Sequence, residues 1–173
     1  MDMNIKDDIL SAYVDIAGRR LPRWAELPDL GLYMDQVLAL MERYLGGAAA
    51  SDEKGLTAAM VNNYVKHGVM PPPDRKKYSR RHLACLIVIC TLKPVLPLPF
   101  IRRLLTAELD AGTEEAFFDR FCAMFEDAGR QAAEAGAALN AAGSGDGTLS
   151  PVWAAALRAR AEQALAMSLL PPE

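Results

Sequence analysis

The sequence predicts an all-α, mainly helical protein with at most one small β-hairpin. Apolar residues recur at helical spacing between turn signals, as in residues 4–17, where Ile5, Ile9 and Ile16 share one face. Outside a proline-rich loop, no run alternates apolar and polar residues long enough to predict a sheet. With 173 residues, 51% hydrophobic and 24% charged, the chain has the composition of one globular core with appended elements, not of a disordered protein.

Local start and stop signals define each element in turn. Trp24 lies in a predicted ordered loop, and Asp29 is a predicted N-cap for the helix that ends at Gly46. Thr57 caps a short helix, and Ser79 caps a nearly all-apolar helix that we expect at the centre of the core. The expected helices span residues 4–17, 30–45, 57–67, 80–93, 99–109 and 152–169, with two more between 113 and 142.

We expect three parts along the chain: an N-terminal helix and ordered loop (1–28), a central domain (29–109), and an acidic helical extension that packs on the core (110–173). The acidic start of the chain excludes a secretory signal, and the longest apolar stretch, 83–92, is too short to cross a membrane. These features predict a cytoplasmic protein without membrane contact.

No catalytic or cofactor chemistry is predicted. The chain lacks phosphate-loop, dinucleotide, zinc-protease and serine-hydrolase motifs, so we expect no enzyme and no cofactor. Cys85, Cys90 and Cys122 form no CxxC pair and are expected to be free thiols. The two histidines are not expected to complete a metal site with them. We expect His82 at the surface, beside a buried Cys85.

Charge is strongly segregated. Residues 55–105 carry nine basic side chains against one acid, Asp74, whereas the rest of the chain carries ten basic and twenty-one acidic side chains. This distribution favours a polyanion-binding surface with an anionic remainder. The alternative is a solvated basic face that pairs with the protein's own acidic helices.

The short helix 57–67 predicts where such a surface lies. Met60, Val61, Tyr64 and Val65 share one arc, which must face the core. The opposite face pairs small and amide side chains with a cation, a combination suited to base edges and phosphates in a DNA groove. Its residues are Thr57 at the cap, Ala59, Asn62, Asn63 and Lys66.

A proline-stiffened basic loop follows this helix. Because three prolines restrict the backbone in advance, a rigid loop or narrow hairpin can hold cations on phosphates at low entropic cost. The residues expected to contact DNA here are Arg75, Lys76, Lys77 and Tyr78, followed by Arg80 and Arg81 at the start of the next helix.

Three stretches carry a resemblance to a known family. Residues 56–71, with Asn63-Tyr64 and Gly68-Val69-Met70-Pro71, are followed by Lys76-Lys77-Tyr78-Ser79-Arg80-Arg81-His82-Leu83 and then Ile101-Arg102-Arg103-Leu104-Leu105. This order resembles a MerR-type winged helix-turn-helix. Together with Leu27-Pro28-Asp29-Leu30-Gly31-Leu32-Tyr33, it more closely resembles an uncharacterised bacterial domain-of-unknown-function family.

The resemblance implies that 29–109 is a winged helix-turn-helix-like domain with a small β-hairpin wing, extended by C-terminal helices. Here Asn63 stands where the MerR pattern has an arginine before its tyrosine, and residues 113–142 show no sustained heptad for a dimerisation helix.

We therefore expect a DNA-binding transcriptional regulator that places helix 57–67 in the major groove of double-stranded DNA and wing 74–81 on phosphates. A homodimer would double the contacts, and an unknown protein or small-molecule effector is left open. The alternative is a protein-interaction adaptor or ligand-sensing domain that has lost DNA binding. In that case apolar residues of the C-terminal helices would line the partner or ligand groove, namely Phe117, Phe118, Phe121, Met124, Trp153 and Met167.

Overall fold

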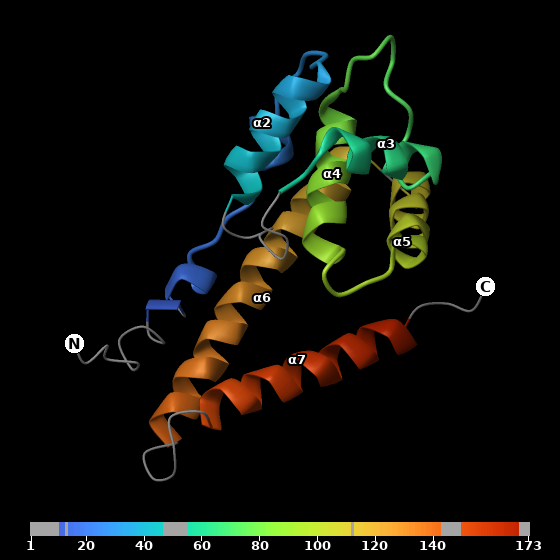
Figure 1. The fold of residues 1–173 in the computed structure, drawn as a ribbon. Helices are drawn as coiled ribbons and strands as arrows, with labels where there is room; N and C mark the ends of the chain where they lie inside the picture. The colour runs from blue at the N-terminus through green and yellow to red at the C-terminus, as the bar shows by residue number, and fades with distance from the viewer. Residues whose placement is uncertain (1–10, 13, 47–54, 112, 143–149, 170–173) are drawn as a thin grey trace. The chain divides into compact units, whose positions relative to one another are not determined.

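The computed structural model describes residues 11–12, 14–46, 55–111, 113–142 and 150–169. The chain divides into two compact units: the core unit, Leu21–Cys122, and the terminal unit, formed by the residues before Leu21 and after Cys122. Most described residues are helical, so the predicted class is confirmed (Figure 1). The core unit extends beyond the expected 29–109 at both ends.

The core unit is built around one buried helix. Its elements are the 3-10 helix η1 (Trp24–Glu26), α2 (Met34–Leu45), α3 (Ala58–Lys66), α4 (Arg80–Leu92), α5 (Leu98–Ala111) and the first turns of α6 (Glu114–Ala142). Helix α4 contacts α2 and α5, and α2 also contacts α3. Every residue from His82 to Ile89 is buried, as expected for a helix that is apolar on all sides.

The start of α6 belongs to this core because the loop before α2 holds it. Phe118 is fully buried, and its ring meets Trp24 edge to face with ring centroids 6.3 Å apart. The backbone N–H of Trp24 donates to the carboxylate of Asp119 at 2.8 Å, and the Cys122 thiol donates to the Pro22 carbonyl at 3.4 Å. The predicted ordered loop around Trp24 therefore joins the two ends of the core unit.

Helix α2 begins later than predicted. Leu32 is drawn into an antiparallel bridge with Tyr78, whose two backbone hydrogen bonds measure 2.9 and 2.8 Å. The bridge requires extended backbone at Leu32, so Tyr33 becomes the N-cap instead of Asp29. The Gln36 side chain accepts from the Tyr33 backbone N–H at 2.9 Å, which satisfies a donor at the helix start.

Of the predicted β-hairpin, only the turn at its tip forms. Within the described residues there is no strand, only two isolated antiparallel bridges, Leu32–Tyr78 and Asp74–Lys77. The reason lies in Pro71-Pro72-Pro73, which offers no backbone N–H and cannot continue a ladder away from the turn.

One long helix replaces the two predicted between 113 and 142. Helix α6 runs unbroken from Glu114 to Ala142, because its alanine-rich sequence tolerates the internal glycines. In the terminal unit, a Cβ on Gly129 would lie 2.8 Å from the carbonyl oxygen of Ile16, so glycine there allows close approach of the helical residues 14–17. Helix α7 (Ser150–Ser168) completes this unit. Residues 4–10 and 13 of the predicted first helix lie outside the described residues.

Candidate nucleic-acid interface

Helix α3 presents one side to the core and the other to solvent. Thr57 is its N-cap, and the Thr57 hydroxyl accepts from the Met60 backbone N–H at 3.3 Å. Val61 and Tyr64 are buried, while Met60 and Val65 are half-buried, so the predicted core arc is confirmed.

The opposite side of α3 is exposed over its whole length. The side chains of Ala59, Asn62, Asn63 and Lys66 are all exposed. Lys66 makes no ion pair with any residue that the structure describes. This surface therefore offers amide donors and acceptors beside an available cation, without a carboxylate.

The chain leaves α3 through a glycine and two buried residues. Gly68 adopts φ +65°, a left-handed conformation that favours glycine after a helix end. The Val69 backbone N–H donates to the Tyr64 carbonyl at 2.9 Å, and Val69 and Met70 are buried. The exit from α3 is thus anchored before the prolines begin.

Two cations form the tip of a tight turn. Asp74 and Lys77 exchange backbone hydrogen bonds of 3.1 and 2.8 Å, which leaves Arg75 and Lys76 as the two central residues. Both adopt positive φ, +48° and +67°, as a type I′ hairpin turn requires. Left-handed backbone costs a residue with a side chain about 1–2 kcal/mol. Figure 1 shows this segment, the connection between α3 and α4, projecting from the helices.

The base of the turn lies against the chain before α2. Tyr78 is buried and its backbone pairs with Leu32. The Lys77 ammonium lies 5.6 Å from the ring centroid of exposed Tyr33, a cation–π contact. A Cβ on Gly31 would lie 3.0 Å from the Lys77 side chain, so a larger residue here would push that side chain away from its place over the backbone.

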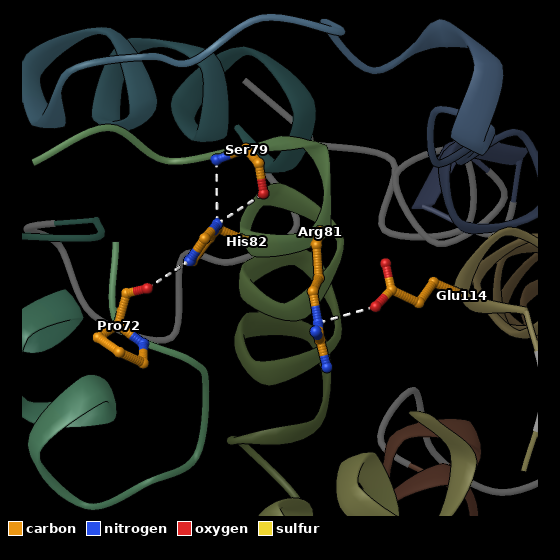
Figure 2. Close-up of polar contacts among 5 residues, drawn as sticks. All are labelled: Pro72, Ser79, Arg81, His82 and Glu114. Atoms are coloured by element: carbon orange, nitrogen blue, oxygen red, sulfur yellow. Dashed lines mark hydrogen bonds and ion pairs between the residues drawn. The ribbon is translucent and has the colours of Figure 1, made fainter. Parts of the chain in front are cut away.

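A single buried histidine joins both sides of the turn to α4 (Figure 2). The His82 Nδ1 accepts from the Ser79 backbone N–H at 3.0 Å and lies 2.8 Å from the Ser79 hydroxyl oxygen. Because that nitrogen accepts, Nε2 carries the proton and donates to the Pro72 carbonyl at 3.1 Å. Burial lowers the pKa of His82 below its ordinary 6.5, with a smaller contribution from Arg81 in the same direction, and so favours this neutral form.

The prediction that His82 lies at the surface is wrong. Only 7% of the residue is exposed. His82 is the third residue of α4, three positions after Ser79, where a Glu or Gln side chain usually completes a capping box. Here the imidazole accepts the hydrogen bond from the Ser79 backbone N–H instead.

The two arginines at the start of α4 are engaged within the protein. The Arg80 guanidinium donates to the Leu27 carbonyl at 3.0 Å, lies 5.7 Å from the Trp24 ring centroid and is 3.7 Å from the Asp29 carboxylate. Arg81 forms a 2.9 Å ion pair with Glu114, also drawn in Figure 2. Part of the basic segment therefore pairs with the protein's own acids, as the alternative interpretation of the charge pattern expects.

The structure thus sorts the predicted contact residues into two groups. Thr57, Tyr78, Arg80 and Arg81 hold the fold through a cap, a backbone bridge, and contacts to neighbouring segments. The other group is exposed on α3 and the turn: Ala59, Asn62, Asn63, Lys66, Arg75, Lys76 and Lys77.

Sequence reasoning missed three residues that shape the turn. Gly31 and Tyr33 lie more than forty positions before Lys77, and only the Leu32–Tyr78 bridge brings them together. For His82 a signal existed, since Ser79-x-x-His82 has the spacing of a capping box.

The described residues contain no cluster of three His, Cys, Asp or Glu side chains that could hold a metal ion. Burial raises the pKa of Cys85 and of Cys90 to about 11, so these thiols are poor nucleophiles at neutral pH. Among the described helices, none combines the length and the apolar character needed to cross a membrane.

Comparison with known proteins gives a family but no activity. A family model described as a domain of unknown function (DUF1836) matches residues 22–122, almost the same range as the core unit. No curated protein and no solved structure matches the chain.

Proposed function

The chain belongs to the family of domains of unknown function DUF1836, a description that carries no activity, and we propose that its core unit is a double-stranded DNA-binding module of winged helix-turn-helix type that regulates transcription. The resemblance to this family supports the boundaries of the module. The activity has to come from the exposed residues of α3 and the turn.

One observation carries the proposal. Lys66, Arg75 and Lys76 are exposed and make no ion pair with any described residue, whereas Arg80 and Arg81 are paired. The unpaired cations lie on consecutive segments, joined by residues 67–73. Their charge is therefore available to an external polyanion such as a phosphate backbone.

The remaining features of α3 favour DNA over other polyanions. Amide side chains can make two hydrogen bonds to an adenine edge in the major groove, and Asn62 and Asn63 are both exposed for that purpose. Ala59 adds little bulk, which lets the helix backbone approach a groove. The element order of α2, α3, basic turn, α4 and α5 supports a MerR-like arrangement, with α3 as the recognition helix and the turn as the wing.

The residues that hold the fold have positioning roles in this proposal. Thr57 sets the start of α3, and Tyr78 fixes the base of the turn through Leu32. Arg80 and Arg81 contribute less to phosphate binding than their number suggests, because Asp29 and Glu114 already neutralise them.

Salt dependence of binding tests the phosphate contacts. We expect the full chain to bind random-sequence duplex DNA in a fluorescence-anisotropy titration, with log affinity falling linearly against log salt concentration. Lys66→Ala should reduce the slope by about one, the value of one lost phosphate contact. Lys93→Ala, which removes an exposed cation from the opposite end of α4, is the matched control and should leave the slope unchanged. No binding at low salt by folded protein would contradict the proposal and favour a protein-interaction adaptor.

The amides of α3 should act on specificity. An operator is first selected from a random duplex pool. Asn62→Ala with Asn63→Ala is then expected to lower the affinity for this operator by about 10- to 100-fold, while the affinity for random duplex changes little. The two affinities differ because base contacts carry sequence information and phosphate contacts do not. Both side chains are exposed and alanine has the higher helix propensity, so thermal stability should not fall. Equal losses on operator and random DNA would show that α3 does not read bases.

A further inference from the structure

The cation at the base of the turn is held differently from the two cations at its tip. Lys77 is exposed and makes no ion pair with any residue that the structure describes, and its ammonium lies 5.6 Å from the ring centroid of Tyr33. Among the described residues, neither Arg75 nor Lys76 makes such a ring contact. The ammonium of Lys77 is therefore held in place without being neutralised by a carboxylate.

The backbone fixes both partners of this contact. Leu32 and Tyr78 exchange backbone hydrogen bonds of 2.9 and 2.8 Å, and Tyr78 is buried. In antiparallel pairing the residues next to such a pair, here Tyr33 and Lys77, lie opposite each other as a non-hydrogen-bonded pair, where side chains come closest. The Tyr33 backbone N–H also donates to the Gln36 side chain at 2.9 Å. The ring and the lysine therefore meet because both stand on hydrogen-bonded backbone.

Gly31 leaves room for the aliphatic part of the Lys77 side chain. Gly31 and Tyr33 flank the bridge residue Leu32, so they lie on the same side of the extended chain. A Cβ on Gly31 would lie 3.0 Å from both the Cβ and the Cδ of Lys77. The methylene groups of Lys77 thus cross bare backbone at Gly31, and the ammonium reaches the ring of Tyr33.

We propose that the base of the turn is a preorganised phosphate contact, in which Tyr33 and Gly31 are positioning residues that hold the Lys77 ammonium ready for the DNA backbone. The inference rests on the proposed DNA-binding function, and it adds two residues more than forty positions before the turn.

The physical advantage of this arrangement is a smaller ordering cost. A lysine side chain loses rotamer freedom when it binds a phosphate, and the contact with Tyr33 restricts Lys77 before DNA arrives. The face of the ring occupies one side of the ammonium, which leaves N–H donors for a phosphate oxygen. Tyr33 is 54% exposed, so the pair lies at the surface. Arg75 and Lys76, which lack such a contact, have to be ordered on binding.

A double-mutant cycle on DNA affinity tests whether Tyr33 acts through Lys77. In the anisotropy titration with random duplex, Tyr33→Leu should lower the affinity about threefold at about 0.1 M salt, the size expected for an exposed cation–π contact, and should leave the salt slope unchanged. Lys77→Ala should reduce the slope by about one. In the Lys77→Ala background, Tyr33→Leu should have no further effect, because the side chain that it positions is absent. Tyr33→Phe keeps the ring face and should bind like the wild type.

Helix α2 provides a matched control near its other end. The Arg43 guanidinium carbon lies 5.7 Å from the ring centroid of Tyr44, so Tyr44→Leu breaks the same kind of contact away from the turn. This variant should bind DNA like the wild type. Because the Tyr33 side chain is exposed, Tyr33→Leu should keep its thermal stability, and a lower affinity then does not reflect unfolding.

The place of the Lys77 side chain can also be measured without DNA. In proton NMR spectra of the free protein, the ring current of residue 33 should shift the Lys77 side-chain protons upfield in the wild type and in Tyr33→Phe, but not in Tyr33→Leu. Absence of this shift in the wild type would overturn the inference.

The DNA measurements separate the two proposals. A folded wild type that binds no DNA would overturn the proposed function, and this inference with it. Binding by the wild type with an equal affinity in Tyr33→Leu would overturn the positioning role alone. The same follows if Tyr33→Leu lowers the affinity equally with and without Lys77, or if Tyr33→Phe loses as much as Tyr33→Leu, which would assign the effect to the hydroxyl group.

Discussion

Replacing His82 with alanine is expected to lower the free energy of unfolding by about 3 kcal/mol, because it removes a buried ring and leaves its hydrogen-bond partners unpaired. The lost contacts are those from the Ser79 backbone N–H and hydroxyl to Nδ1 and from Nε2 to the Pro72 carbonyl. The edge-to-face contact with the Tyr78 ring, at 5.5 Å between centroids, is lost too. Urea denaturation followed by circular dichroism measures the change.

The same histidine should make stability depend on pH. Since burial lowers the pKa of His82 in the folded state below 6.5, the unfolded chain binds more protons as the pH falls. The contribution of His82 is therefore complete above pH 6.5 and is lost progressively as the pH falls below 6.5 toward the folded-state pKa. Other groups also titrate in this range, so the difference between wild type and variant is the quantity to follow.

His82→Gln separates the capping contact from the titration. A glutamine at this position can accept from the Ser79 backbone N–H, as in an ordinary capping box, but it does not titrate. We expect a loss of about 1 kcal/mol above pH 6.5 and a smaller difference from wild type at pH 5. If the difference between wild type and His82→Gln were independent of pH, the neutral buried state assigned to His82 would be wrong.

Replacing the tip of the turn is expected to change stability and DNA affinity in opposite directions. Asn-Gly is the preferred pair at the centre of a type I′ turn, so Arg75→Asn with Lys76→Gly relieves the positive-φ cost of the two native residues. Thermal or urea unfolding should show a gain of about 1 kcal/mol. The same change removes two proposed phosphate contacts, which should lower DNA affinity about 100-fold at 0.1 M salt and reduce the salt slope by about two.

This pair of measurements separates folding from binding, because a variant that loses affinity while it gains stability has not simply unfolded. The control, Lys93→Gln with Arg102→Gln, removes two exposed charges from the same basic segment outside the turn. Its affinity should fall far less than that of the turn variant. Unchanged affinity in the turn variant would show that the turn does not contact DNA, even if α3 does.

Local signals predicted most helices because caps and breakers act over a few residues. Thr57 and Ser79 start α3 and α4 as expected, and the apolar composition of α4 correctly predicted its central position. The start of α2 and the length of α6 were not predicted. Extended pairing of Leu32 with Tyr78 delays α2, and one long helix forms where two were predicted because the alanine-rich sequence of α6 tolerates its internal glycines.

The candidate site, like the fold, has features that the sequence predicts and features that depend on long-range contacts. Sequence alone indicated which cations are concentrated between residues 55 and 105 and which face of α3 carries Asn62, Asn63 and Lys66, because helical periodicity and charge are properties of the chain itself. Only the tertiary structure decided which cations are available. Asp29 and Glu114, far along the chain, neutralise Arg80 and Arg81, while Arg75 and Lys76 stay at the tip of a strained turn held by Leu32 and His82. Long-range pairing and burial determine these outcomes, and neither can be deduced from spacing along the sequence.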